Sequence, residues 1–522
     1  MLRKIRIVLA IVFWTLITWL LVDFTGTAHL YLGWMAKIQF IPAVLALNAV
    51  ALLFLLALAL LFGRIYCSII CPLGVMQDAI AWFRKKKNKY SYSPARNTMR
   101  YGFLLLSTVI LVANLGWLAG LLFPYSTYGR IVGTVVAPLY KMCNNVLAGI
   151  AEHYESYAFY EVDVWLKSVP ALVIALISWT VIAVLAWRGG RTWCNTVCPV
   201  GTLLGLISKH SLYGPVIDTN KCNSCGLCAR NCKSACINSK DHTIDMSRCV
   251  MCGNCMEKCN RNALTFGLRG KTAEATEKKT TEAASAETAQ EAKPVDETRR
   301  AVLTSTVLLA GSALVRAEEK TTDGGFAIIE DKQKPKRAHK IVPPGALSVR
   351  NLQSHCTACQ LCIDSCPNDV LRPSSSLGTF MQPEVSFERG YCRPECNTCS
   401  QVCPTGAIKP ISIEERTATQ VGHAVWVEKN CIPAQEGKPC GNCARHCPAG
   451  AIQLVPASDA YRKGDRGQWF DADNKRIDGR MVPMKPVINE EKCIGCGACE
   501  NLCPSRPFSA IYVEGHDIHR EI

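Results

Sequence analysis

Apolar residues are concentrated in about the first 190 positions of the chain, whereas most cysteine, proline and charged residues follow. In that first part, four apolar stretches lie at about 5–24, 38–62, 101–123 and 169–187. Each is long enough for a hydrocarbon layer that takes about 20 helical residues. The pattern predicts four transmembrane helices, followed by soluble, loop-rich domains.

Basic residues indicate the side of the membrane on which the chain begins. The opening MLRKIR is basic, and so is the loop between the second and third stretches, which contains Arg64, Arg84, Lys85, Lys86, Lys87, Lys89, Arg96 and Arg100. By the positive-inside rule the N-terminus is cytoplasmic, and four crossings return the chain to the cytoplasm after residue 187. The net charge of +16 is accompanied by no recognition motif, so we expect no nucleic-acid partner.

Two segments near the middle of the chain have a different composition. Residues 269–297 are rich in Ala, Glu, Thr and Lys with almost no large apolar residue, which predicts a disordered linker. Residues 298–317 place Arg299 and Arg300 before a short apolar run and resemble a twin-arginine export signal. If it is retained, this segment is a fifth membrane anchor. A chance arginine pair before a short buried helix is the alternative.

Thirty cysteines suggest metal chemistry, because disulfide scaffolds are short secreted chains without such repeated clusters. Two copies of C-x2-C-x2-C-x3-C are Cys222, Cys225, Cys228, Cys232 and Cys249, Cys252, Cys255, Cys259. In this bacterial-ferredoxin pattern three cysteines hold one 4Fe-4S cluster and the fourth serves its neighbour. We therefore expect Cys259 to join the first three and Cys232 to join Cys249, Cys252 and Cys255. Lys233 and Asn260 replace the usual proline, and the third cysteine of each copy disfavours zinc.

Sixteen further cysteines predict four more clusters, about six in all. They are Cys356, Cys359, Cys362, Cys366; Cys392, Cys396, Cys399, Cys403; Cys431, Cys440, Cys443, Cys447; and Cys493, Cys496, Cys499, Cys503. The sequences CPTGAI and CPAGAI predict turns leading into short strands. The spacings resemble four-cluster electron-transfer subunits of molybdenum oxidoreductases. That resemblance implies an exchange of the fourth ligand between the first and last groups, and between the two middle groups.

A third cysteine pattern lies at the ends of two apolar stretches. RIYCSIICPLG contains Cys67 and Cys71, and RTWCNTVCPVG contains Cys194 and Cys198. The cysteines of each pair lie one helical turn apart, and proline follows the second. They could bind metal, cycle as redox thiols or only close the helices, and the duplication favours a redox or docking role. Cys143 and Cys236 remain as expected bystanders.

Together these motifs resemble a known pair of families. Residues 1–268 resemble the NapH family of membrane ferredoxins of periplasmic nitrate reductase systems, and residues 298–522 resemble the NapG family. The resemblance implies a fusion that oxidises quinol from the membrane pool and delivers electrons to a terminal reductase or small carrier. A redox maturation or repair factor for another metalloenzyme is the alternative.

The expected fold class is a membrane α-helical domain of four or five spans joined to α+β bacterial-ferredoxin-like 4Fe-4S domains. The expected boundaries are 1–210 for the membrane domain, 211–268 for the two-cluster ferredoxin, 269–297 for the linker, 298–317 for the signal or anchor and 345–522 for the four-cluster domain. We expect a cytoplasmic-membrane protein with its first ferredoxin domain cytoplasmic and its C-terminal domain periplasmic. No independent catalytic site, Walker loop, dinucleotide fingerprint or haem motif is found.

Overall fold

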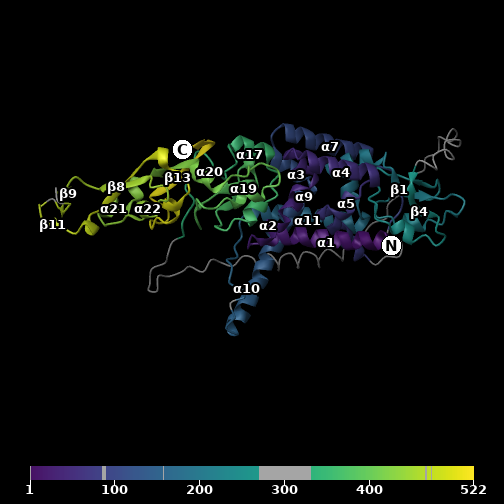
Figure 1. Cartoon of the computed structure of the whole chain (residues 1–522), viewed down its shortest axis with the longest axis horizontal. Coiled ribbons are helices and arrows are strands. Elements are labelled where there is room, and N and C mark those ends of the chain that lie inside the picture. The colour runs from purple at the N-terminus through teal and green to yellow at the C-terminus, as the bar shows by residue number, and fades with distance from the viewer. Residues whose placement is uncertain (1, 85–89, 157, 270–330, 465–466, 472) are drawn as a thin grey trace, which may run out of the picture. The chain divides into compact units, whose positions relative to one another are not determined.

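The computed structural model describes residues 2–84, 90–156, 158–269, 331–464, 467–471 and 473–522. Contacts divide the chain into two compact units, one formed by Met1–Arg269 with Lys332–Ile522 and the other by Gly270–Asp331. The expected signal 298–317 and all but the first residue of the expected linker 269–297 lie outside the described residues. Everything below concerns the first unit (Figure 1).

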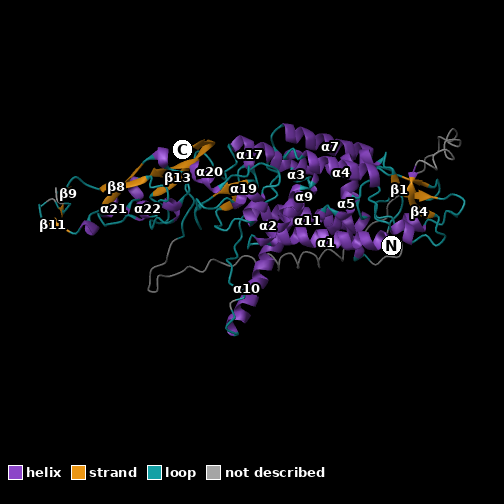
Figure 2. Ribbon diagram, viewed as in Figure 1, coloured by secondary structure: helices purple, strands orange, loops and turns teal. Residues whose placement is uncertain are grey.

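The described residues up to 208, here called the helical part, form helices only (Figure 2). They are α1 (Leu2–Val22), α2 (Thr27–Lys37), α3 (Phe40–Leu45), α4 (Ala49–Phe62), α5 (Tyr66–Ile69), α6 (Pro72–Trp82), α7 (Asn97–Val112), α8 (Gly116–Ala119), α9 (Pro124–Ile131), a π-helix (Val132–Val136), α10 (Ala137–His153), α11 (Val169–Gly189), α12 (Thr192–Thr196) and α13 (Pro199–Ser208). Pro72 and Pro199 open α6 and α13, where the missing backbone N–H leaves no hydrogen bond unmade.

Three continuous helical runs are long and apolar enough to cross a membrane: Leu2–Val22, Pro124–His153 and Val169–Gly189. The second of them consists of α9, the π-helix and α10. The expected single span 38–62 is wrong, because Leu47 has a positive φ of 51° that separates α3 from α4. Asn48 then caps α4 by accepting a hydrogen bond from the N–H of Ala51. The result is a helix of 14 residues rather than one continuous span.

The expected span 101–123 is interrupted in the same way. Asn114 has a φ of 59°, so α7 ends at Val112 and only the short α8 follows. The long helix at Pro124–His153 is not evident from hydropathy, because Lys141, Asn144 and Asn145 interrupt its apolar pattern. Four unbroken spans are therefore not what the chain forms.

Two cysteine-rich parts contain the strands. In the first cysteine domain (residues 213–269), β1 (Tyr213–Ile217) pairs antiparallel with β4 (Leu264–Leu268), and β2 (Ile237–Asn238) with β3 (Thr243–Ile244). Its helices are α14 (Leu227–Arg230) and α15 (Asn254–Glu257). The β1–β4 pair joins the two ends of the cysteine-bearing segment, as in an α+β ferredoxin, whereas β2 and β3 close a short hairpin within it.

The second cysteine domain (residues 332–522) is built from the same small elements. Its antiparallel strand pairs are β5 (Leu371–Pro373) with β6 (Pro383–Val385), β7 (Thr419–Trp426) with β13 (Ile511–Glu521) and β8 (Ile452–Pro456) with β12 (Met484–Ile488); β9 (Arg462–Lys463), β10 (Trp469–Phe470) and β11 (Arg476–Ile477) form a small sheet. Its helices are α17 (Val349–His355), α18 (Leu361–Asp364), α19 (Thr398–Val402), α20 (Ile413–Ala418), α21 (Ile432–Glu436), α22 (Asn442–Arg445) and α23 (Ala498–Asn501). A strand follows CPAGAI as expected, whereas CPTGAI is followed by none.

The helical part contacts both cysteine domains, and α1 and α11 do so with opposite ends. Near its start α1 carries Arg3, which pairs with Glu257 of the first cysteine domain, and its last turns contact α18 of the second. Just before α11, the ammonium of Lys167 donates to the carbonyl oxygen of Ile363 at 2.8 Å. Just after α11, the N–H of Arg191 donates to the carbonyl oxygen of Lys233 at 2.8 Å.

The segments α3–α4 and α7–α8 repeat this arrangement. The carbonyl of Leu60 in α4 accepts from the N–H of Leu212 at 2.9 Å, and Arg100 in α7 donates to Ser247 at 3.0 Å. At the other ends, Ala46 lies against Gly406, and Gly116 lies so close to Cys356 that a Cβ there would be 2.7 Å from its carbonyl oxygen. Four helical segments therefore connect the two cysteine domains.

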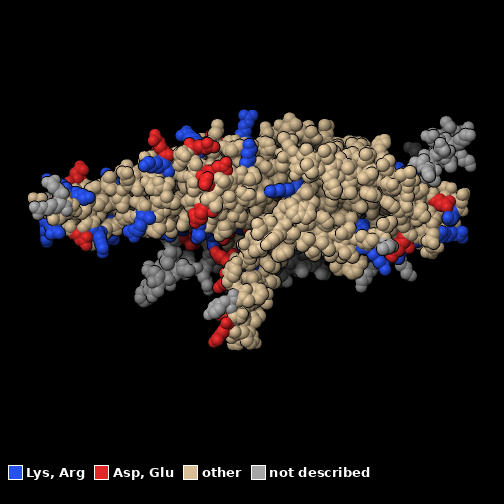
Figure 3. Space-filling model, viewed as in Figure 1, with Lys and Arg blue, Asp and Glu red and all other residues tan. Residues whose placement is uncertain are grey.

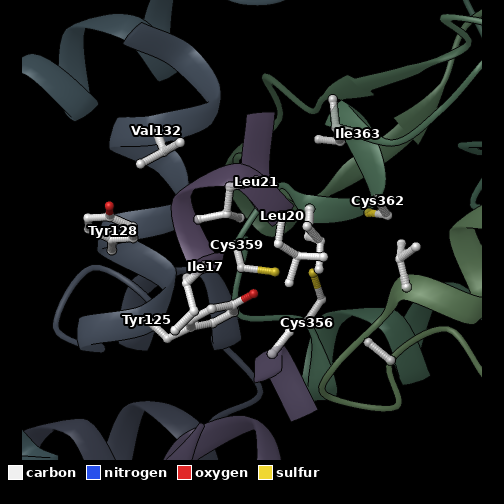
Figure 4. Packing of buried hydrophobic residues seen from close by; sticks show 14 of the residues in the cluster. Ile17, Leu20, Leu21, Tyr125, Tyr128, Val132, Cys356, Cys359, Cys362 and Ile363 are labelled. Carbon is white, nitrogen blue, oxygen red and sulfur yellow. The ribbon is translucent and has the colours of Figure 1, made fainter. Parts of the chain in front are cut away.

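The contact with the second cysteine domain is tightly packed. Gly120, Gly129 and Gly133 all lie where a Cβ would collide with the loop from Thr357 to Asp364. Figure 4 shows Leu20 of α1 and Tyr125 of α9 beside Cys359, within one continuous buried cluster. Every residue of α9 is buried.

Candidate iron-sulfur and thiol sites

The first cysteine domain gathers its eight predicted ligands around two cavities. One, of about 200 Å³, is lined by Cys222, Cys225, Cys228 and Cys259. The other, of about 290 Å³, is lined by Cys249, Cys252, Cys255 and Cys232. The last cysteine of each motif lies with the first three of the other, which is the exchange expected from the spacing.

The second cysteine domain also gathers its sixteen cysteines in fours, but in a different partition from the one expected. Cys503 shares a cavity with Cys431, Cys440 and Cys443, and Cys447 shares one with Cys493, Cys496 and Cys499. Cys403 interacts electrostatically with Cys356, Cys359 and Cys362, and Cys366 with Cys392 and Cys399. The fourth ligand is exchanged between the first and second groups and between the third and fourth groups. The exchange implied by resemblance, between the first and last groups and between the two middle groups, is therefore wrong.

Chain connectivity gives a physical reason for this partition. Consecutive groups close shorter loops than the first and last groups would, and loop closure loses less entropy when fewer residues are enclosed. The second cysteine domain is therefore two two-cluster units in tandem, each with the local exchange already present in the first cysteine domain.

The surroundings of these cysteines suit 4Fe-4S clusters, which the thiolates would hold and which supply one-electron redox chemistry when bound. Backbone N–H groups point at the sulfurs of the fourth cysteines: Ala451 at Cys447 and Ala510 at Cys503, each at 3.3 Å, and Ile408 at Cys403 at 3.4 Å. Such hydrogen bonds stabilise an anionic sulfur. Among the described residues, no three His, Cys, Asp or Glu side chains are close enough to hold a single metal ion.

A buried arginine provides a further indication of an anionic group. Arg416 of α20 is fully buried and donates from Nη2 to the sulfur of Cys392 at 3.2 Å, while its Nε and Nη1 have no partner within the described chain. Burial alone would lower the pKa of Arg416, but the thiolate of Cys392 raises it above its ordinary value. Unpaired donors beside a cysteine group are what a sulfide-rich cluster would satisfy.

Cys236, which the sequence analysis left as an expected bystander, lies directly beside a predicted ligand. It is buried, its sulfur lies 3.5 Å from that of Cys232, and this contact lowers the pKa of Cys232 to about 6. Three other groups have alanine four residues after their last cysteine, namely Ala263, Ala407 and Ala451. This position therefore carries a thiol in one group where three other groups carry alanine.

Lys233, which replaces the usual proline, connects the first cysteine domain to the helical part. Its ammonium pairs with Asp78 of α6 at 2.7 Å, and the same carboxylate binds Arg191 at 2.7 Å and Arg6 at 3.2 Å. A proline at 233 would lose this ion pair. The departure from the motif is therefore a docking contact.

The structure brings the two CxxxCP segments together with an approximate two-fold exchange. Nη2 of Arg64, in the first segment, donates to the carbonyl of Cys194 at 3.0 Å, and Nη1 of Arg191, in the second, donates to that of Cys67 at 2.7 Å. Cys67 and Cys194 each have an exposed fraction of 4%, and their sulfurs interact electrostatically with each other. Cys71 and Cys198 lie beside them.

Two of the basic residues counted as a cytoplasmic loop have a structural role instead. Arg64 and Arg100 are buried, and both donate to the carbonyl oxygen of Ser247, at 3.0 and 3.2 Å. They join the helical part to the first cysteine domain. Cys143, by contrast, is exposed on α10.

Comparison with known proteins identifies iron-sulfur sequences in both halves of the chain. A 4Fe-4S binding domain family matches residues 44–90 and 171–214, another 4Fe-4S binding domain family matches 242–265, and a 4Fe-4S dicluster domain family matches 438–506. The first match contains all four CxxxCP cysteines. No solved structure matches the chain.

Individual relatives are ferredoxin-type proteins. The methylamine utilization ferredoxin-type protein MauM of Methylobacillus flagellatus is 32% identical over 197 residues, covering 34% of this chain and 70% of that protein. MauM of Methylorubrum extorquens is 30% identical over 219 residues, 41% of this chain and 87% of that protein. The ferredoxin-type protein NapG of Escherichia coli is 29% identical over 175 residues, 31% of this chain and 66% of that protein.

Proposed function

Since this chain belongs to the family of ferredoxin-type proteins that includes MauM, we propose that it is a membrane-bound 4Fe-4S electron carrier that passes electrons from membrane quinol to a partner reductase. In this proposal the helical part is the membrane half of a NapH–NapG-like fusion. The six ferredoxin-type cysteine groups hold six clusters.

The observation that carries the proposal is the attachment of cysteine groups to both ends of the same helices. Helix α1 contacts the first cysteine domain near Arg3 and the second through its last turns. A straight helix of its 21 residues is about 31 Å long, close to the thickness of a hydrocarbon core. Clusters at the two ends would lie on opposite sides of a membrane.

The surface of the helical part supports a membrane location. Large apolar side chains on its outer faces are exposed, among them Val12, Leu53, Leu105, Val109 and Ile177. Figure 3 shows few Lys, Arg, Asp or Glu residues over α4 and α7, whereas charges gather over the second cysteine domain. A soluble protein rarely exposes so continuous an apolar surface, because water penalises it.

In the proposed path, electrons pass from quinol through the clusters to an external acceptor. Quinol oxidation releases two electrons and two protons. Because each cluster would accept one electron, at least two clusters in the oxidised state are needed to oxidise one quinol. The thiolates hold the clusters, and Arg416 places a positive charge beside one of them. We propose that the first cysteine domain is cytoplasmic and the second periplasmic, delivering electrons to an external acceptor.

Reduction by quinol is the direct test. Protein purified anaerobically and placed in lipid nanodiscs should lose its visible iron-sulfur absorbance on addition of a reduced menaquinone analogue. The loss should stop when an inhibitor of quinol oxidation is present. If dithionite bleaches the clusters but no quinol does, the quinol role is wrong, and the alternative of a maturation factor with a soluble donor becomes the better reading.

Sidedness needs a separate experiment. Protease added to intact spheroplasts should cleave the second cysteine domain of the native protein. A double variant Arg299→Lys, Arg300→Lys should leave it protected, because the twin-arginine route exports folded proteins. Protection of residues beyond 355 in the native protein would place both cysteine domains in the cytoplasm.

A further inference from the structure

The two CxxxCP segments form a site that the six ferredoxin groups leave unexplained. We propose that Cys67, Cys71, Cys194 and Cys198 together hold a seventh 4Fe-4S cluster, shared between the two segments. The four sulfurs interact electrostatically with one another, and their residues have exposed fractions of only 3–4%. The ligands come in two pairs, and each pair lies where one short helix ends and the next begins.

The backbone at this site is arranged for anionic sulfur. Cys71 immediately precedes α6, of 11 residues, and Cys198 immediately precedes α13, of 10 residues. The sulfur of Cys198 accepts a hydrogen bond from the N–H of Gly201 at 3.4 Å, and Cys71 has the matching contact with the N–H of Gly74. A helix N-terminus presents free N–H groups and a positive dipole end, both of which favour a thiolate over a thiol.

Two buried arginines, one from each CxxxCP segment, supply positive charge beside these sulfurs. Nη2 of Arg64 lies 4.0 Å from the sulfur of Cys67, and Nη1 of Arg191 lies 3.9 Å from that of Cys194. Arg191 has Asp78 as a partner, but no Asp or Glu of the described chain pairs with Arg64. A fully buried guanidinium without a counter-charge is strongly destabilising.

That missing counter-charge separates the alternatives. Neutral thiols or two disulfides would leave Arg64 buried and uncompensated, whereas four thiolates around a cubane carry net negative charge. Nε of Arg64 and Nη2 of Arg191 also have no hydrogen-bond partner within the described residues. As in the ferredoxin groups, the described cysteines here are too far apart for a single metal ion. The family match over residues 44–90 and 171–214 is to 4Fe-4S binding proteins.

The position of this site gives the seventh cluster a task, and this part of the inference rests on the proposed function. Arg64 joins the site to the first cysteine domain through the carbonyl of Ser247 at 3.0 Å. Cys71 and Tyr66 also belong to the continuous buried cluster that contains Tyr125 and Cys359. An electron would otherwise have to tunnel the length of α1, and tunnelling slows steeply with distance. A cluster held by these four cysteines would supply one-electron transfer between its neighbours, with no bond or proton transferred.

Iron counting on the full chain tests the site. Native protein should contain about 28 iron atoms, four for each of seven clusters, instead of about 24. The double variant Cys67→Ser, Cys194→Ser should lose about four iron atoms while the EPR signals of the ferredoxin clusters remain. Cys143→Ser is the matched control, because that cysteine is exposed, and it should lose none.

A second measurement on native protein guards against a variant that fails to fold. Anaerobic denaturation in the presence of an alkylating agent, with the clusters still intact at the start, should label Cys143 and Cys236 first and the four CxxxCP cysteines only as iron is released. About 24 iron atoms together with four immediately labelled or disulfide-bonded CxxxCP cysteines would overturn the proposal. About 28 iron atoms without any reduction by quinol would support the seventh cluster but contradict the proposed function.

Discussion

Replacing Arg416 by glutamine removes a positive charge that lies beside one cluster and little else. The guanidinium is fully buried, and its Nη2 donates to the sulfur of Cys392 at 3.2 Å. An electron added to the cluster is spread over iron and sulfur atoms beyond that sulfur, so about 6 Å is a reasonable separation of charges. At an effective dielectric constant of about 20, the attraction is about 3 kcal/mol.

That attraction stabilises the reduced, more negative cluster, so its loss lowers the midpoint potential. For a one-electron couple about 1.4 kcal/mol corresponds to about 59 mV, and about 3 kcal/mol therefore corresponds to roughly 120 mV. Water entering the space left by the shorter side chain offsets part of this. We expect the largest fall, about 100 mV, in the cluster of Cys392 and a smaller one in that of Cys496, whose sulfur also interacts with Arg416, with the other potentials unchanged.

The assay is an anaerobic redox titration followed by EPR, with the iron content measured on the same samples. Arg416→Lys keeps the charge and should recover most of the shift. Arg476→Gln is the matched control, because Arg476 is exposed on β11 and its charge is screened by solvent. If Arg416→Gln retains its iron and every midpoint stays within about 20 mV of native, the electrostatic reasoning is wrong.

Three further predictions concern the cysteines themselves. Cys228→Ser should cost about four iron atoms in the first cysteine domain and leave the four C-terminal signals intact, and zinc in place of iron in native protein would contradict the cluster assignment. Cys236→Ala removes a weak S–H donor to Cys232, so it should keep all its iron and lower one midpoint by roughly 20–50 mV; a loss of iron would make Cys236 a ligand instead. Cys403→Ser should remove the same EPR component as Cys359→Ser, and Cys503→Ser the same as Cys443→Ser; matching Cys503 with Cys359 would restore the outer exchange.

Local spacing predicted the candidate ligands but not which distant groups they meet. The exchange of Cys232 and Cys259 was predictable, because the two motifs are adjacent and the geometry of the pattern fixes which cysteine points away. In the second cysteine domain four groups allow several pairings, and the cysteine spacing within each group does not choose between them. Only the packing of β7 against β13 and β8 against β12 brings Cys503 to Cys443 and Cys447 to Cys496.

Hydropathy determined where apolar segments lie but not where helices break. Backbone reversals at Leu47 and Asn114 depend on positive φ values, which hydropathy does not report. The long helix at Pro124–His153 carries polar residues that only its packing explains. Arg64, which looks like a loop charge, is a buried contact between three segments.

What the sequence by itself determined is the chemistry. Iron-sulfur ligands are recognised by residue type at short, fixed separations, and such separations can be read directly from the sequence. What only the tertiary structure decided is which groups meet, because Arg64 and Arg191 reach Cys194 and Cys67 across more than 100 residues. Contacts of that length depend on how whole helices pack, and no local pattern encodes them. The duplicated CxxxCP segments were visible in the sequence, but their union into one four-sulfur site was not.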